Sequence, residues 1–155
     1  MIKLGKGIVT FALVTTFVVS IAVDWNDSHI YNPEWPPHAR FHDILLLLFM
    51  TQLGLLLAWL MWREGAREVD VLLATLYTVF FWTPFFYIQA IVPSSSLGVG
   101  GADPTVHLIG LGIYVNAIVG FVEAALATAG FFVYRRGLRR AAPATSRGAV
   151  AADRG

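Results

Sequence analysis

Four long apolar runs, separated by polar segments, dominate the pattern of residues along the chain. Each run is long enough to cross the roughly 30 Å hydrocarbon core of a bilayer, which takes about 20 helical residues. The apolar residues within a run are continuous rather than alternating, which argues against the strands of a membrane β-barrel. The sequence therefore predicts an all-α integral membrane bundle, a single domain over residues 1–140, with four transmembrane helices near residues 7–23, 44–62, 71–92 and 106–134.

The positions of the basic residues indicate how the predicted helices are oriented. Ten of the 11 lysines and arginines precede the first run, lie between the second and third, or follow the fourth, whereas Arg40 lies elsewhere. Because cytoplasmic segments are enriched in lysine and arginine, this distribution predicts an N-in/C-in topology. Residues 24–43 and 93–105 are then outer loops. Residues 141–155 lack periodicity and are expected to form a disordered cytoplasmic tail.

The first run also has features of a signal peptide. A basic start, a short apolar run and the small residues of Ser20-Ile21-Ala22 are typical of a cleavage site. Removal of residues 1–22 is therefore an alternative to a first transmembrane helix, and it would leave three spans with the same loops outside. Either outcome predicts a multi-pass protein of the bacterial plasma membrane, in contact with membrane lipid.

The composition agrees with a membrane protein and excludes several functions. The chain is 57% hydrophobic and 14% charged, with a mean hydropathy of +0.66, whereas soluble domains have about 25% charged residues. Its 11 basic residues are balanced by 10 acidic ones, so no basic face for nucleic acid is expected. The absence of cysteine excludes disulfides, iron–sulfur clusters and thiolate zinc sites.

The first outer loop, DWNDSHIYNPEWPPHARFHD, is rich in groups that bind metals or move protons. Proline suits the first turn of a helix, so a helix is predicted to begin near Pro37. His38 and His42 then stand one turn apart on one face, a spacing that can chelate a divalent metal such as zinc, copper or iron. Asp43 is the first candidate for a further metal ligand, and other candidates are Asp24, Asp27 and His29.

The alternative for this loop is an anchor at the membrane interface. Tryptophan and tyrosine rings belong at headgroup level, and arginine is stable beside lipid phosphates. Trp35 and Arg40 are the loop residues that fit either role, as ligand-binding groups or as anchors.

The fourth run carries a carboxyl group, Glu123, far from both of its ends. Inserting an ionisable group at that depth costs at least ~2 kcal/mol, which makes Glu123 a candidate catalytic acid. Asn116 lies two turns earlier on the same face and is a second candidate. Small residues continue the stripe, which is expected to face other helices: Gly112, Gly120 and Ala127. The alternative role of Glu123 is a helix–helix hydrogen bond to Thr15, Thr16, Gln52 or Thr78.

Ligand-binding candidates come from the second and third runs. Seven aromatic residues between positions 77 and 87 surround Pro84, which is expected to kink the helix. Trp82, Phe85 and Tyr87 among them are candidates to line a pocket for a flat lipophilic ligand, although lipid-facing bulk explains them equally well. Gln52 lies about −40° around the second helix from His38, so the histidine face and a buried Gln52 are expected to look into the same side of the bundle. His107 is expected to open the fourth helix, about 160° around it from Glu123.

The string N-P-x-W-P-P-H-A-R-F-H, which opens the second run, resembles an uncharacterised family of small bacterial and fungal four-helix membrane proteins. A looser similarity is to the emopamil-binding and sigma-2-receptor type of four-span fold. That resemblance implies a cavity for a sterol-like ligand and, in some members, isomerisation of a double bond by membrane-buried acid and histidine residues. This chain shares the span number and the acidic residue in the fourth span. It lacks the histidine and glutamates expected inside the second and third spans.

These observations predict a membrane protein that binds or acts on a lipophilic small molecule, such as a quinone, isoprenoid or sterol-like compound. Acid–base chemistry would occur in a pocket open to the outer side, with His38 and His42 at its mouth and Glu123 and Asn116 deeper. A divalent metal at the outer loop is a candidate cofactor. The alternative is a non-catalytic membrane subunit or homo-oligomer, in which the polar stripe packs against a partner.

Overall fold

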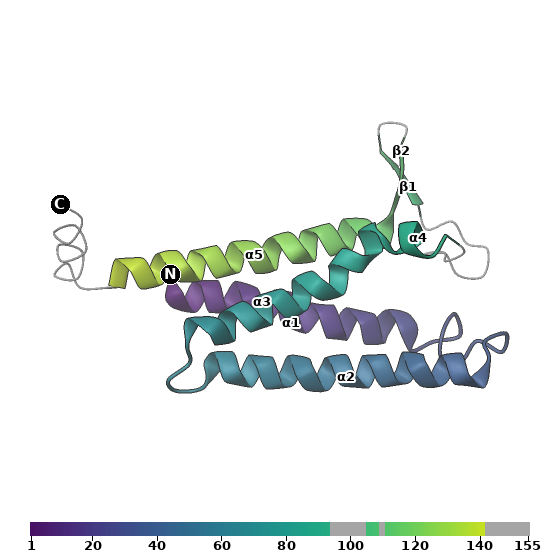
Figure 1. Ribbon diagram of the computed structural model, residues 1–155, viewed down its shortest axis with the longest axis horizontal. Coiled ribbons are helices and arrows are strands. Elements are labelled where there is room, and N and C mark those ends of the chain that lie inside the picture. The colour runs from purple at the N-terminus through teal and green to yellow at the C-terminus, as the bar shows by residue number, and fades with distance from the viewer. Residues whose placement is uncertain (94–104, 109–110, 142–155) are drawn as a thin grey trace.

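The computed structural model describes residues 1–93, 105–108 and 111–141. Four long helices lie side by side (Figure 1), namely α1 (Ile2–Asp24), α2 (Pro37–Trp62), α3 (Glu68–Trp82) and α5 (Val115–Ala141). Within the described residues, four helical segments are long and apolar enough to cross a membrane, which agrees with the predicted number of spans. Most of the predicted tail, 141–155, and most of the second outer loop, 93–105, lie outside the described residues.

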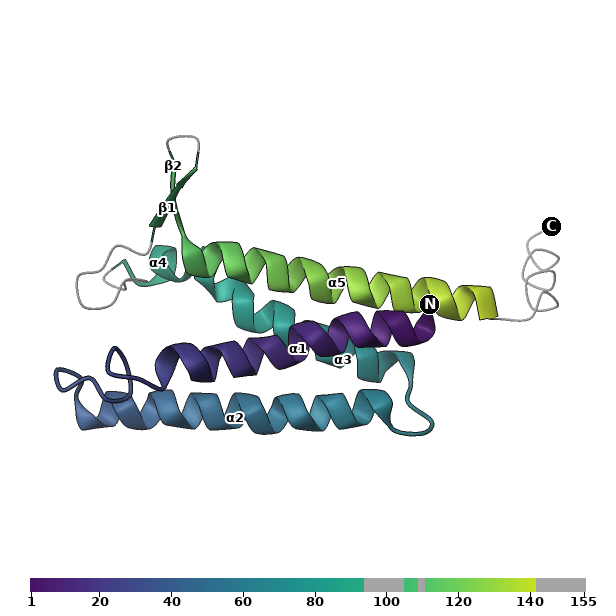
Figure 2. The same cartoon turned by 180° about the vertical axis from the view of Figure 1, so that it is seen from behind.

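Helices α1 and α3 occupy the middle of the bundle, with α2 on one side of them and α5 on the other (Figure 1, Figure 2). Each outer helix packs against both central helices. In a lipid environment such packing is stabilised by close van der Waals contact rather than by release of water. The main hydrophobic cluster comprises Val9, Leu13, Leu57, Met61, Val71, Ala74, Phe131 and Tyr134.

Glycines allow α1 and α5 to approach closely. A Cβ atom added to Gly5 would lie 2.7 Å from the carbonyl oxygen of Gly130. One added to Gly130 would lie 2.9 Å from the side chain of Val9. The stripe predicted on the fourth helix is buried at Gly120, Glu123 and Ala127, so these members of the stripe face other helices as expected.

The third apolar run is broken at its proline. Helix α3 ends at Trp82, and the chain continues as a 3₁₀ turn (Thr83–Phe86) and the short helix α4 (Ile88–Ile91). Pro84 has no backbone N–H, and its ring excludes the carbonyl of Phe80 from the helical position. The predicted kink is therefore present as a change of helix type.

The fourth helix begins later than predicted. Instead of a helix from Val106, the structure has an antiparallel hairpin of β1 (Thr105–Leu108) and β2 (Leu111–Tyr114), and α5 begins at Val115. Glycine and β-branched residues disfavour a helix in this segment, and the β-branched residues suit strands. His107 is thus opposite Gly112 in the hairpin, and the predicted angle between His107 and Glu123 around one helix does not apply. Glu123 lies eight residues, or about 12 Å, from the start of α5, nearer one end than predicted.

Charge is segregated between the two ends of the bundle. At one end, called here the basic end, α1 and α3 begin and α2 and α5 end. The described basic residues that lie there are Lys3, Lys6, Arg63, Arg67, Arg135, Arg136, Arg139 and Arg140. The basic end also has Glu64, Glu68 and Asp70, so its described charge is positive on balance. The opposite end, called the acidic end, has Arg40 and the carboxyl groups of Asp24, Asp27, Glu34 and Asp43.

Candidate functional site

The histidine pair stands where the sequence predicts it. Helix α2 begins at Pro37, which confirms the predicted start, and the Nε2 atoms of His38 and His42 lie 3.0 Å apart. The two rings are nearly perpendicular, with centroids 4.4 Å apart, and the ring of Phe41 flanks both. Two ring nitrogens at this distance share one hydrogen, so one imidazole donates and the other accepts.

An apolar groove extends from this pair along the surface of α2. Its lining comprises His42, Leu45, Leu46 and Phe49, and its volume is about 360 Å³. All of these side chains are exposed. The face of α2 that packs into the bundle is formed by other residues, namely Leu47, Met50, Gly54, Leu57 and Met61. The groove therefore lies on the face of α2 that is turned away from the other helices.

Gln52 belongs to this outward face. It follows Leu45 and Phe49 at helical spacing, and its side chain is exposed. The predicted alignment of Gln52 with His38 around the helix is retained. The prediction that this face looks into the bundle is wrong, because packing against α1 and α3 uses the opposite face of an evenly apolar helix.

A second group of polar side chains orders the loop between α1 and α2. The Nε2 atom of His29 lies 3.6 Å from Oδ1 of Asp24, and its Nδ1 atom lies 2.8 Å from Oγ of Ser28. The Trp35 ring meets the His29 ring edge-on, with centroids 5.3 Å apart. The Arg40 guanidinium donates to the carbonyl oxygen of Trp35 at 3.1 Å. Trp35 and Arg40 thus act within the loop, and neither lines the groove.

Asp43 joins this loop group rather than the histidine pair. It precedes Leu47 by one turn on the inward face of α2, and it interacts electrostatically with His29. Its Oδ2 atom is buried and accepts no hydrogen bond from the described residues. The described part of the chain also holds no group of three His, Asp or Glu side chains arranged around a metal position. The predicted set of His38, His42 and Asp43 is therefore reduced to the two histidines.

Glu123 lies inside the bundle and is bonded to α1. The Thr15 hydroxyl donates to Oε2 of Glu123 at 3.0 Å. Trp82 of α3 lies beside Gly120, one turn away, and its Nε1 donates to Oγ1 of Thr16 at 3.0 Å. The partner found for Glu123 is one of the four that the hydrogen-bonding alternative names.

The remaining candidates are spread over different surroundings. Trp82 is buried, Phe85 is half-buried against it, and Tyr87 is exposed beyond the end of α3. Asn116 is half-buried near the start of α5. Because α1 and α3 separate α2 from α5, the structure does not bring Glu123 and Asn116 to the histidine pair.

Sequence reasoning does not identify Ser28, and it names Thr78 only as a possible partner of Glu123. Ser28 positions the His29 ring while its own hydroxyl lies 2.5 Å from Oδ1 of Asn26, an arrangement set by the turns of the loop. Thr78 is fully buried in α3 with a hydroxyl that has no partner among the described residues. Neither has a motif, since serine and threonine are common in loops and apolar helices alike.

Comparisons with known proteins place the chain in a family. No curated protein and no solved structure matches it. The looser similarity to the emopamil-binding and sigma-2-receptor type of fold therefore finds no support. A family model matches residues 8–145, a range that includes all of α2, α3 and α5 and most of α1. The chain belongs to DUF6640, a family of unknown function, in agreement with the expectation of an uncharacterised family.

Proposed function

We propose that this protein spans the bacterial plasma membrane in an N-in/C-in orientation and binds a lipophilic small molecule on the outer side of α2. The observation that carries the proposal is the hydrogen-bonded pair of His38 and His42 at one end of an exposed apolar groove. The segregated charge supports the orientation, because it puts the basic end in the cytoplasm and the groove near the outer surface.

The groove suits a molecule with an apolar body and a polar head. Leu45, Leu46 and Phe49 offer apolar contact, and His42 offers a ring nitrogen at the point where the groove meets the acidic end. Because this face of α2 is turned away from the other helices, the molecule would enter sideways from the outer leaflet. A quinone or another isoprenoid has both parts, because its apolar body can contact the lining of the groove and its carbonyl or hydroxyl head can bond to His42.

The histidine pair provides the chemistry. Within the pair, the donor imidazole keeps a free lone pair on its Nδ1 atom and the acceptor imidazole keeps a hydrogen on its Nδ1 atom. A ligand oxygen can therefore donate a hydrogen bond to the first ring or accept one from the second. The same two nitrogens can bind one divalent metal, since a separation of 3.0 Å fits two bonds of about 2.1 Å. Water or the ligand would then complete the coordination.

The alternative of an interaction subunit is less favoured, because part of the stripe on which it depends packs within the chain. The stripe of Gly120, Glu123 and Ala127 packs against helices of the same chain rather than facing outward. Glu123 is accordingly assigned to packing, and His38 and His42 are assigned to the ligand.

Equilibrium binding of a short-chain quinone to the protein in lipid nanodiscs tests this proposal. Losing a hydrogen bond to a polar head weakens binding by about tenfold, so His42→Ala should show at least that loss. His29→Ala is the matched control, because His29 is also in the first outer loop but outside the groove. Equal affinities for His42→Ala and wild type, or an equal loss in His29→Ala, would contradict the assignment.

A further inference from the structure

A second groove lies at the basic end of α5. It is lined by Phe132, Arg135, Arg136 and Arg139, and its volume is about 390 Å³. Phe132, Arg136 and Arg139 follow one another at helical spacing, so they share one face of the helix. The three side chains are exposed on that face.

The charge of this groove is strongly positive. Arg135 is paired with Glu68, with 2.6 Å between its Nε atom and Oε1. Asp70, another carboxylate at the basic end, is buried and forms ion pairs with Arg63 and Arg67. Among the described residues, no acidic side chain lines the groove, so its positive charge attracts an anion.

The depth of the groove distinguishes a lipid from a free anion. Phe132 lies about 6 Å deeper along α5 than Arg136 and about 10 Å deeper than Arg139. Phe132 is 60% exposed within an apolar span. A ligand that fills the groove therefore needs a negative group at the level of the arginines and an apolar chain beside the ring.

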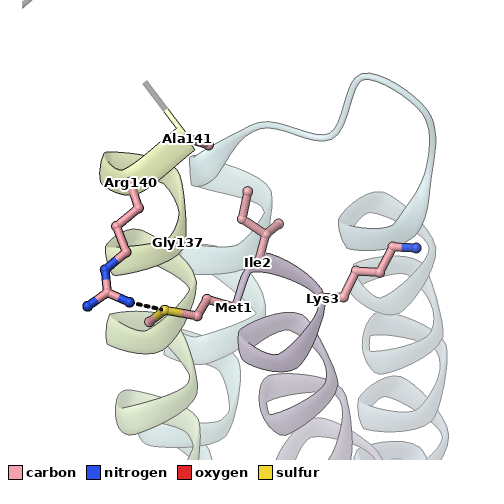
Figure 3. A pocket seen from close by; sticks show the side chains of 6 residues that line it. All are labelled: Met1, Ile2, Lys3, Gly137, Arg140 and Ala141. Atoms are coloured by element: carbon pink, nitrogen blue, oxygen red, sulfur yellow. Dashed lines mark hydrogen bonds between the residues drawn. The ribbon is translucent and has the colours of Figure 1, made fainter. Parts of the chain in front are cut away.

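A neighbouring cavity between the start of α1 and the end of α5 is less suited to an anion. Its volume is about 570 Å³, and Gly137 and Ile2 form part of its wall. Figure 3 shows Arg140 directed at Met1, whose sulfur accepts a hydrogen bond at 3.1 Å, while Lys3 points away. One arginine and one lysine are among the described residues that line this cavity, whereas three arginines line the groove.

We propose that the end of α5 binds an anionic phospholipid, with the phosphate at Arg136 and Arg139 and an acyl chain along Phe132. Arginine forms paired hydrogen bonds to phosphate oxygens, and its long side chain reaches headgroup level from the edge of the hydrocarbon core. The site is independent of the groove on α2, so either proposal can fail while the other holds.

Native mass spectrometry of the protein released from nanodiscs of phosphatidylcholine and phosphatidylglycerol tests this site. The wild type should retain phosphatidylglycerol selectively, and Arg136→Gln/Arg139→Gln should lower that retention by about tenfold or more. The matched control is Lys3→Gln/Lys6→Gln, which removes the same charge from the same end but from α1, and it should retain the lipid. If the arginine variant and the lysine variant retained phosphatidylglycerol equally, or lost it equally, the proposal of a specific site on α5 would be overturned.

A second variant separates a lipid from a free phosphate. Phe132→Asn keeps all the arginines but removes the apolar contact, so it should lower retention of phosphatidylglycerol. Millimolar inorganic phosphate should leave the lipid bound to the wild type. Displacement of the lipid by phosphate, or full retention in Phe132→Asn, would identify an anion site without a lipid and would refute the proposal.

Discussion

The Thr15 hydroxyl of α1 donates a hydrogen bond to Oε2 of Glu123 in α5, over 3.0 Å and 108 positions of sequence. The same hydroxyl lies 2.8 Å from the carbonyl oxygen of Phe11 and 3.1 Å from that of Ala12. Because the Thr15 hydroxyl has one hydrogen, it donates a hydrogen bond to one of these three acceptors at a time. A protonated Glu123 can then donate to the Thr15 oxygen, so the helix–helix contact persists in either protonation state.

We therefore expect Glu123→Gln to be nearly neutral. The amide of glutamine has the same length and can donate to or accept from Thr15, so the free energy of unfolding should change by less than about 0.5 kcal/mol. Thr15→Val, which removes the hydroxyl and keeps the shape, should cost about 0.5–1.5 kcal/mol. Reversible unfolding in bicelles measures both. Loss of ligand binding in a folded Glu123→Gln protein would return Glu123 to the candidate site.

Glycine at the α1–α5 interface should be required for stability. Gly5→Ala introduces a Cβ atom against the backbone of α5, where no flexible side chain can move away. Overpacking of this kind costs about 1–3 kcal/mol. Gly7→Ala is the matched control, because nothing lies within 4 Å of its added Cβ atom. Thermal unfolding in detergent should show a lower midpoint for the Gly5 variant alone, and similar midpoints would argue against close packing.

Local rules were enough to predict the helix start and the histidine spacing. A proline at the first position fixes where α2 begins, and a spacing of four residues then fixes the relation of His38 to His42. These features depend on a few neighbouring residues. The same is true of the change in helix type at Pro84.

The sequence of α2 does not predict which face of the helix packs into the bundle. Leu45, Leu46 and Phe49 on the outer face are as apolar as Leu47 and Met50 on the inner face, because lipid and protein interior favour the same side chains. The choice depends on partners far away in sequence, such as Phe17 of α1, which packs against Gly54. The expected inward position of Gln52 is consequently wrong. The hairpin cannot be predicted for a related reason, since a short apolar run does not distinguish a strand from a helix.

The histidine pair should bind a divalent metal with two protein ligands. Detergent-purified wild-type protein, after equilibration with zinc and gel filtration, should retain up to one ion per chain. Elemental analysis measures the zinc content.

His38→Ala/His42→Ala should lose this zinc and His29→Ala should retain it. The control is informative because His29 has its own carboxylate neighbour, Asp24, and lies in the same loop. Retention of zinc by the double variant would show that the metal binds elsewhere, with the group around His29 and Asp24 as the next candidate. A complete absence of zinc from the wild type would leave the pair as a proton donor and acceptor alone.

The proposed orientation can be tested with single cysteines, because the natural chain has none. Glu34→Cys places an exposed thiol at the acidic end, and Glu64→Cys places one at the basic end. In intact cells, a membrane-impermeant maleimide should label only the Glu34 variant, since the basic end is proposed to face the cytoplasm. Permeabilised cells should label both variants, which controls for thiol access. Labelling of Glu64→Cys alone in intact cells would reverse the orientation and place the groove on α2 at the cytoplasmic side.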